Sequence, residues 1–164
     1  MRTAYQTKIK LDNFETSPEL AEVKVVYKSK QRNNKVKIGT SQEAFDVLFS
    51  LYDKDTIGYF EQFYLLLLNR ANAVLGWIKL SSGGTSGTVV DMKMIFALAL
   101  LTNSHGILIC HNHPSGNISP SNADIVLSKS IKQAGKLLTI ELIDHLIINA
   151  DGCYHSLSDN GDLL

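Results

Sequence analysis

The spacing of apolar positions predicts three helices after residue 40. A capping-box pattern at residues 40–43 (Thr-Ser-Gln-Glu) precedes apolar positions at helical spacing, which are Ala44, Val47, Leu48 and Leu51. A second helix is predicted over 91–101, with one apolar face made of Met92, Ile95, Phe96, Ala99 and Leu100. A third helix is predicted to begin at Ser121 and to end at Gly135, because glycine commonly follows the last residue of a helix.

Short apolar runs between these helices predict strands. The runs at 62–69 and 106–110 are continuous rather than alternating, which indicates strands covered on both faces. Residues 73–80 are predicted to pair with the first run after a turn, and further strands are expected over 139–149 and near Tyr154. Helices that alternate with strands indicate an α/β sandwich with a mixed sheet.

The glycine-rich stretch 81–88 is predicted to be a loop. It is not followed by the Gly-Lys-Ser/Thr of a phosphate-binding loop, so that interpretation fails.

Composition limits the classes of protein that fit. A length of 164 residues suits one domain or one domain with an arm, and 45% hydrophobic residues suffice for a core. Sixteen basic residues balance sixteen acidic ones, so net charge does not favour nucleic-acid or membrane binding. Two cysteines are too few for a disulfide framework, and the longest apolar stretch is far shorter than a membrane span. We therefore expect a cytoplasmic protein without a membrane partner.

Residues 1–38 are expected to form an N-terminal arm with a strand over 22–30, and residues 39–164 the folded domain. Between Lys24 and Lys37 the arm carries six basic residues and no acidic ones, namely Lys24, Lys28, Lys30, Arg32, Lys35 and Lys37. We interpret this stretch as a solvated strand edge and loop, because lysines on an edge also block sheet-to-sheet association. A weak contact with nucleic acid is the alternative interpretation.

The candidate chemistry is concentrated in residues 111–124, directly after a predicted buried strand. Side chains alternate faces in extended chain, so His111 and His113 point the same way. Asp124 lies on the first turn of the third helix and shares a face with the apolar residues Leu127, Ile131 and Ala134. This face looks toward the core, where a lone carboxylate is costly unless a cation offsets the cost.

Two imidazoles and one carboxylate leave the fourth position of zinc open, which is typical of catalytic rather than structural sites. Nitrogen ligands favour zinc over magnesium or calcium. Cys110 adjoins His111 and faces the other side of the strand, so it is a poor ligand. A closed structural site would need a fourth ligand, and the remaining candidates are Cys153, His105, His145 and His155. None of them is closely spaced in sequence to His111 or His113. Taken alone, the segment from Ser121 to Asp124 is also an ordinary capping signature.

This stretch resembles the metalloprotease motif of the JAB1/MPN/Mov34 superfamily, called JAMM: a distant Glu, then His-x-His, seven residues, Ser, two residues and Asp. Here seven residues follow His113, and Ser121 is then followed after two residues by Asp124. The fuller string His-Asn-His-Pro-Ser-Gly is similar to the RadC-like branch, historically labelled DNA repair proteins. The resemblance covers about residues 38–160.

The resemblance implies a three-layer α/β/α sandwich of the cytidine-deaminase type and one zinc ion per chain, held by His111, His113 and Asp124. It implies that Glu61 is the general base, which takes a proton from water and passes it to the leaving nitrogen. It implies that Ser121 holds the water or hydrogen-bonds the developing oxyanion. The implied activity is hydrolysis of peptide or isopeptide bonds in a peptide or protein substrate.

Two other functions were weighed against hydrolysis of amide bonds. A nucleic-acid-linked adaptor or nuclease on the same metal-binding fold is the alternative, from the repair label and the basic stretch at Lys24–Lys37. Nucleobase deamination is disfavoured, because zinc deaminases need a Cys-x-x-Cys that this sequence lacks.

Asp144 and His145 lie within the strand predicted over 139–149. Alternation places their side chains on opposite faces, so both cannot serve one site as simple neighbours. We interpret them as a polar pair at a strand edge. The alternative is a role beside the metal ligands or in substrate contact.

Overall fold

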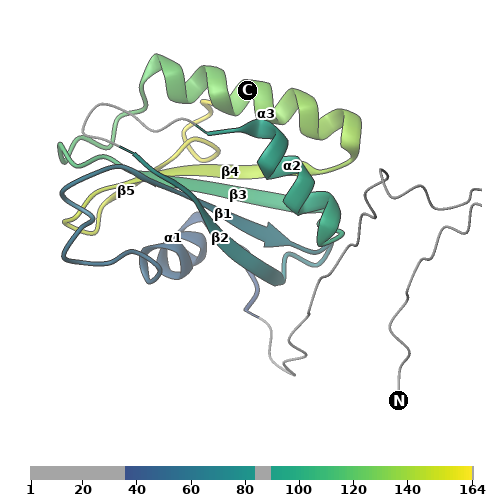
Figure 1. Cartoon of the computed structure of the whole chain (residues 1–164), viewed down its shortest axis with the longest axis horizontal. Helices are drawn as coiled ribbons and strands as arrows, with labels where there is room; N and C mark the ends of the chain where they lie inside the picture. Colours follow the sequence, from purple (N-terminus) through teal and green to yellow (C-terminus); the bar gives the residue numbers. More distant parts are fainter. Residues whose placement is uncertain (1–35, 84–89, 164) are drawn as a thin grey trace, which may run out of the picture.

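The computed structural model describes residues 36–83 and 90–163, whose centre is a five-stranded mixed sheet (Figure 1). The strand order is β2-β1-β3-β4-β5, and every neighbouring pair is antiparallel except β3 and β4. The strands are β1 (Gln62–Leu68), β2 (Val74–Ser82), β3 (Gly106–Asn112), β4 (Glu141–Ile148) and β5 (Tyr154–Ser156). The strand expected over 22–30, most of the basic stretch and most of the glycine-rich loop lie outside the described residues.

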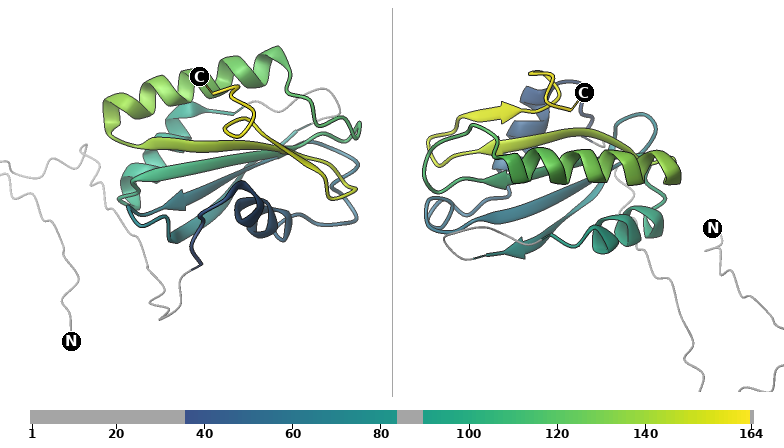
Figure 2. Two further views of the ribbon diagram at one scale, coloured as in Figure 1. Left: turned by 180° about the vertical axis from the view of Figure 1, so that it is seen from behind. Right: turned by 90° about the horizontal axis from the view of Figure 1, so that it is seen from above.

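In the described part of the chain, three helices cover the two faces of this sheet: α1 (Ser41–Phe49), α2 (Met92–Leu101) and α3 (Asn122–Leu138). Figure 2 shows α1 on one face and α2 with α3 on the other. Buried residues form two clusters accordingly, one beneath α2 and α3 and one beneath α1. The prediction of a three-layer α/β/α sandwich with a mixed sheet is confirmed. No helix in the described part of the chain has the length and apolar character needed to cross a membrane.

The central strands β1 and β3 follow from their continuous apolar runs, because all seven residues of each are buried. Alternate residues of β1 pack on opposite layers, with Leu65 beneath α2 and α3 and Leu66 beneath α1. This arrangement confirms the prediction that both strands are covered on two faces. It also places β3, which carries the histidine motif, at the centre of the sheet.

The start of α1 agrees with the predicted cap at Thr40. The Thr40 side chain accepts a hydrogen bond from Glu43 N, and the Glu43 carboxylate accepts from Gly39 N, one residue before the expected Thr40. Asp91 caps α2 by accepting from Lys93 N. The predicted apolar face of α2 was partly wrong, because Met92 and Leu100 are exposed whereas Ile95, Phe96 and Ala99 are buried.

The predicted end of the third helix was also wrong. Helix α3 continues to Leu138, and Thr139 ends it in the left-handed conformation with φ 57°. Gly135 is an interior residue required by close packing: a Cβ there would lie 2.2 Å from the Ile140 carbonyl oxygen. The short turn that joins α3 to β4 thus needs glycine for space rather than for capping.

Candidate metal centre

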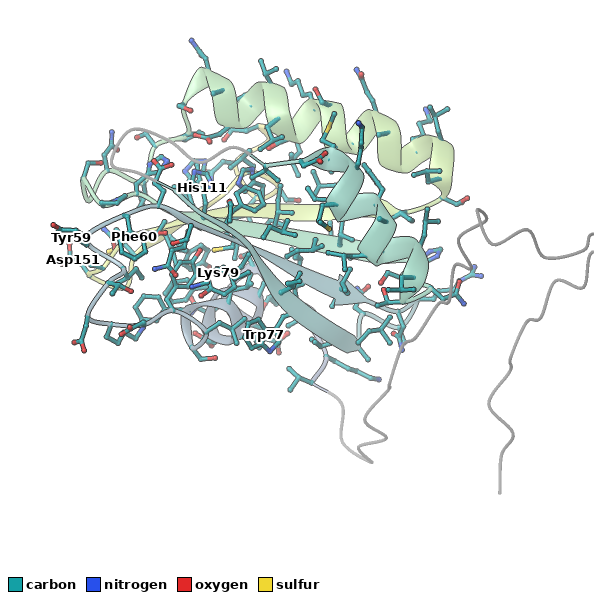
Figure 3. The ribbon with its side chains drawn as sticks, viewed as in Figure 1. Tyr59, Phe60, Trp77, Lys79, His111 and Asp151 are labelled. Atoms are coloured by element: carbon teal, nitrogen blue, oxygen red, sulfur yellow. The ribbon has the colours of Figure 1, made fainter. Side chains whose placement is uncertain are left out.

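His111, His113 and Asp124 converge where β3 ends and α3 begins. Figure 3 shows His111 on the α3 side of the sheet. The two imidazole Nε2 atoms are 2.9 Å apart. Asp124 Oδ1 lies 3.2 Å from His111 Nε2, and Asp124 Oδ2 lies 3.8 Å from His113 Nε2. The prediction that the two histidines share a face and that Asp124 points toward them is confirmed.

These separations fit one tetrahedral ion. Zinc bonds of about 2.0–2.2 Å to nitrogen and oxygen place neighbouring ligand atoms roughly 3.3 Å apart. The Nε2–Nε2 separation of 2.9 Å and the His111 Nε2–Asp124 Oδ1 separation of 3.2 Å are close to this value, and one ligand atom from each of the three side chains lies within 4.8 Å of the others. Within residues 36–83 and 90–163, this is the only group of three or more His, Cys, Asp or Glu side chains close enough to hold a metal. Glu61, His105, Cys153 and His155 lie outside it.

The turn after β3 fixes the orientation of His113. Its Nδ1 lies 2.7 Å from the Asn117 carbonyl oxygen. A carbonyl cannot donate, so the hydrogen belongs to Nδ1, and neutral His113 presents an Nε2 lone pair to the other ligands. Asn149 supports this turn by donating to the Gly116 carbonyl oxygen at 3.0 Å.

Asp124 divides its two oxygens between the helix and the candidate site. Oδ2 accepts hydrogen bonds from Ser121 N at 2.7 Å and from Ser121 Oγ at 2.6 Å. In return, Asp124 N donates to Ser121 Oγ, and the two residues together form a capping box. Oδ1 faces His111. Partial burial raises the pKa of Asp124, but His111 and the hydrogen bonds from Ser121 outweigh it and hold the pKa below its usual range. Asp124 can therefore cap the helix through Oδ2 and serve as a metal ligand through Oδ1 at the same time.

Ser121 was expected to act on water or on an oxyanion. In the structure its hydroxyl donates to Asp124 Oδ2, and the residue is exposed to solvent. Ser121 therefore contacts a candidate ligand, which it orients.

Glu61 lies in the segment just before β1 and is half-buried. The paired residues of β1 and β3 end at Phe63 and His111, and Glu61 lies two residues before Phe63. The chain therefore places Glu61 at the end of the sheet that carries His111. The Glu61 carbonyl oxygen accepts from Gly83 N at 2.9 Å, which ties this segment to the end of β2.

Asn112 holds the same segment in place, and the sequence analysis missed it. Its side chain donates to the carbonyl oxygens of Ile57 and Phe60 at 2.5 and 2.9 Å, and accepts from Gln62 N at 2.7 Å. Asn112 is fully buried on the strand face opposite the histidines. A polar residue inside an apolar strand was the available signal, because buried amides need partners.

His145 also contacts the candidate ligands, contrary to the strand-edge interpretation. β4 lies between β3 and β5, so Asp144 and His145 are 3% and 0% exposed. His145 Nε2 is 2.8 Å from His111 Nδ1, and His145 Nδ1 is 2.6 Å from Ser128 Oγ. Burial lowers the pKa of His145 well below its ordinary value, and His111 adds to this effect.

Asp144 faces the α1 side, as alternation predicted. It accepts hydrogen bonds from Ser156 Oγ at 2.6 Å, Ser158 N at 2.9 Å and His145 N at 2.7 Å. Burial raises the pKa of Asp144, although these hydrogen bonds oppose the shift. Asp144 therefore belongs to the packing between β4, β5 and the C-terminal turn rather than to the metal centre.

Cys110 is confirmed on the other side of β3. It packs in the α1 layer, where Tyr52 Oη lies 3.6 Å from its sulfur and 3.3 Å from its carbonyl oxygen. Burial raises the pKa of the Cys110 thiol to about 12. A buried, protonated thiol on the wrong face does not serve as a ligand.

A three-layer sandwich whose third strand ends in a His-x-His pair facing an aspartate at a helix start defines the JAB-type class of domains. Residues 38–162 match the family described as the RadC-like JAB domain, and the chain belongs to this family.

Similar proteins include UPF0758 proteins of three bacteria. The chain is 41% identical to that of Flavobacterium johnsoniae over 127 residues, which are 76% of this chain and 53% of the relative. It is 41% identical to that of Porphyromonas gingivalis (62% of this chain, 44% of the relative) and 44% identical to that of Clostridium tetani (60% and 43%). The chain thus spans about half the length of these curated relatives.

Proposed function

We propose that this domain is a zinc-dependent hydrolase of peptide or isopeptide bonds. The observation that carries the proposal is the convergence of two imidazole Nε2 atoms and one carboxylate within 2.9–3.8 Å. No fourth protein ligand joins them in the part of the chain that the structure describes. Such a donor set suits one zinc ion with a position left for water. When bound, zinc supplies an activated water near neutral pH and polarises a carbonyl group.

Glu61 is the proposed proton carrier. Its place two residues before Phe63, which pairs with His111, supports this role because it lies at the end of β1 nearest the candidate ligands. It would accept a proton from water and deliver it to the leaving nitrogen. Asn112 supports this role because it anchors the backbone on both sides of Glu61.

Ser121 is proposed to position Asp124. Its hydroxyl holds Oδ2, which leaves Oδ1 directed at His111. The same hydroxyl lies at the exposed rim of the site, where its oxygen would accept a hydrogen bond from the water.

The test is hydrolysis of peptide and isopeptide libraries by zinc-loaded protein and by Glu61→Gln. Loss of a general base lowers kcat by about 10²–10⁴-fold. Glu141→Gln is the matched control, because Glu141 is an exposed glutamate just before the buried part of β4. Absence of any turnover that depends on Glu61 in zinc-loaded protein would argue against amide hydrolysis.

The alternative function, a nucleic-acid-linked adaptor or nuclease, depends on the six basic residues between Lys24 and Lys37. It predicts DNA binding that weakens steeply with salt and disappears when these six residues become serine. Absence of binding at low salt would remove this alternative.

A further inference from the structure

We infer that Ser128 and His145 fix the tautomer of His111, so that His111 Nε2 presents a lone pair to the metal centre. Both are positioning residues: they are fully buried and act on the metal centre only through His111. The inference deepens the proposed zinc site and rests on it. It follows from the direction of three consecutive hydrogen bonds.

The direction is set at a backbone carbonyl. Ser128 Oγ lies 2.6 Å from the Asp124 carbonyl oxygen, one helical turn earlier. A carbonyl oxygen has no hydrogen, so the single hydroxyl hydrogen of Ser128 lies in this contact. Ser128 Oγ therefore has only lone pairs for its second partner, His145 Nδ1 at 2.6 Å. That bond requires the hydrogen to be on His145 Nδ1.

His145 transmits the direction to His111. It is 0% exposed, and its two ring nitrogens contact only Ser128 and His111. In the neutral ring, a hydrogen on Nδ1 leaves a lone pair on Nε2. His145 Nε2 then accepts from His111 Nδ1 at 2.8 Å. Neutral His111 then has its lone pair on Nε2.

When both imidazoles are neutral, the consequence is a cluster of acceptors without a hydrogen between them. His113 Nε2 carries a lone pair because the hydrogen of that ring is on Nδ1, bonded to the Asn117 carbonyl oxygen. His111 Nε2 carries a lone pair because the bonds through Ser128 and His145 place the His111 hydrogen on Nδ1. Both face each other at 2.9 Å, with the Asp124 carboxylate beside them. Such an arrangement is repulsive until a cation lies between the three groups. The hydrogen bonds therefore prepare the site for a metal ion.

The bonded chain also links two ligands through α3. It begins at the Asp124 backbone carbonyl, runs through Ser128 and His145, and ends at His111, whose Nε2 faces the Asp124 carboxylate. The first residues of α3 thus supply one ligand and orient a second. Packing alone does not call for these polar side chains, because their buried neighbours on the same layer, such as Ile131 and Ile147, are apolar.

The first test compares zinc dissociation constants, measured by chelator competition, for the unsubstituted chain and Ser128→Ala. Loss of the hydroxyl frees His145 to adopt the other tautomer, which would place a hydrogen on His111 Nε2. Removing a group that orients a metal ligand weakens binding by about 10–100-fold, and we expect the lower end of this range. Ser130→Ala is the matched control, because Ser130 makes the same bond to the carbonyl four residues earlier, at 2.8 Å, outside the buried face. Ser128→Thr keeps the hydroxyl and is expected to restore binding.

The second test reads the tautomers directly. Nitrogen-15 NMR of the metal-free chain, at a pH where the imidazoles are neutral, is expected to show a hydrogen on His145 Nδ1 and none on Nε2. A hydrogen on His145 Nε2 would overturn the inference, and this measurement needs no substitution that could impair folding.

The outcomes separate the two proposals. Failure of the unsubstituted chain to bind zinc would overturn the proposed function, while the NMR result would still decide the direction of the hydrogen bonds. Zinc binding by the unsubstituted chain with less than a twofold change in folded Ser128→Ala would overturn the inference alone.

Discussion

Replacing Gly135 by alanine sets two effects of opposite sign against each other. Gly135 is helical, so alanine gains about 1 kcal/mol of helix propensity. The new Cβ, however, would lie 2.2 Å from the Ile140 carbonyl oxygen, whereas carbon–oxygen contacts of this kind begin at about 3.3 Å. The backbone after α3 would have to retreat by about 1 Å, and Ile140 N donates to the Gly135 carbonyl oxygen at 2.9 Å in the same turn. Overpacking of a tight site costs typically 1–3 kcal/mol.

The clash involves backbone rather than a flexible side chain, so we expect it to prevail. A clash with backbone falls near the upper end of the overpacking range, about 3 kcal/mol, so Gly135→Ala should lower the free energy of unfolding by about 2 kcal/mol after the propensity gain of about 1 kcal/mol is subtracted. Urea denaturation followed by circular dichroism measures this change. Gln133→Ala is the control, because Gln133 is exposed on the same helix and should change stability little. A Gly135→Ala chain as stable as the parent would refute the argument from close packing.

Two further predictions follow from buried titratable groups. Iodoacetamide at pH 8 should modify Cys153, which is exposed, and spare Cys110, whose thiol is buried with a pKa of about 12. Mass spectrometry should find one adduct in folded protein and two in denaturant. Rapid modification of Cys110 in folded protein would contradict its burial. The raised pKa of Asp144 means that, above its ordinary value of 3.8, the folded state keeps a proton that the unfolded state releases. Its contribution to stability therefore falls as pH rises through this window. The stability of the parent relative to Asp144→Asn should increase as pH is lowered toward 4, by at most about 1.4 kcal/mol per pH unit, and a constant difference would contradict the raised pKa.

The parts of the site that local geometry determines could be predicted from the sequence. Alternation along a strand places His111 and His113 on one face, and helical periodicity directs Asp124 inward, where all three meet. The same periodicities gave the order of helices and strands and the layered sandwich. These features depend only on neighbours within about one helical turn or a few strand residues.

The parts that depend on distant segments could not be predicted in this way. The His145 ring is buried against Ser128 of α3 and His111 of β3, and its strand is not an edge because β5 pairs with β4. Gly135 is set by contact with Ile140 across a turn, although its residue type suggested a helix end. Asn112 bonds to residues more than 50 positions earlier in the chain. Glu61 lies at the same end of the sheet as His111 only through the register of β1 with β3, which no local pattern specifies.

Zinc stoichiometry by native mass spectrometry tests the central claim most directly. The account predicts one zinc ion per chain in the unsubstituted protein and none in His113→Ala. His155→Ala should keep the ion, because His155 pairs with Asp162 at 2.8 Å and lies outside the ligand group. A folded chain that takes up no zinc, or a His113→Ala chain that retains it, would contradict the account.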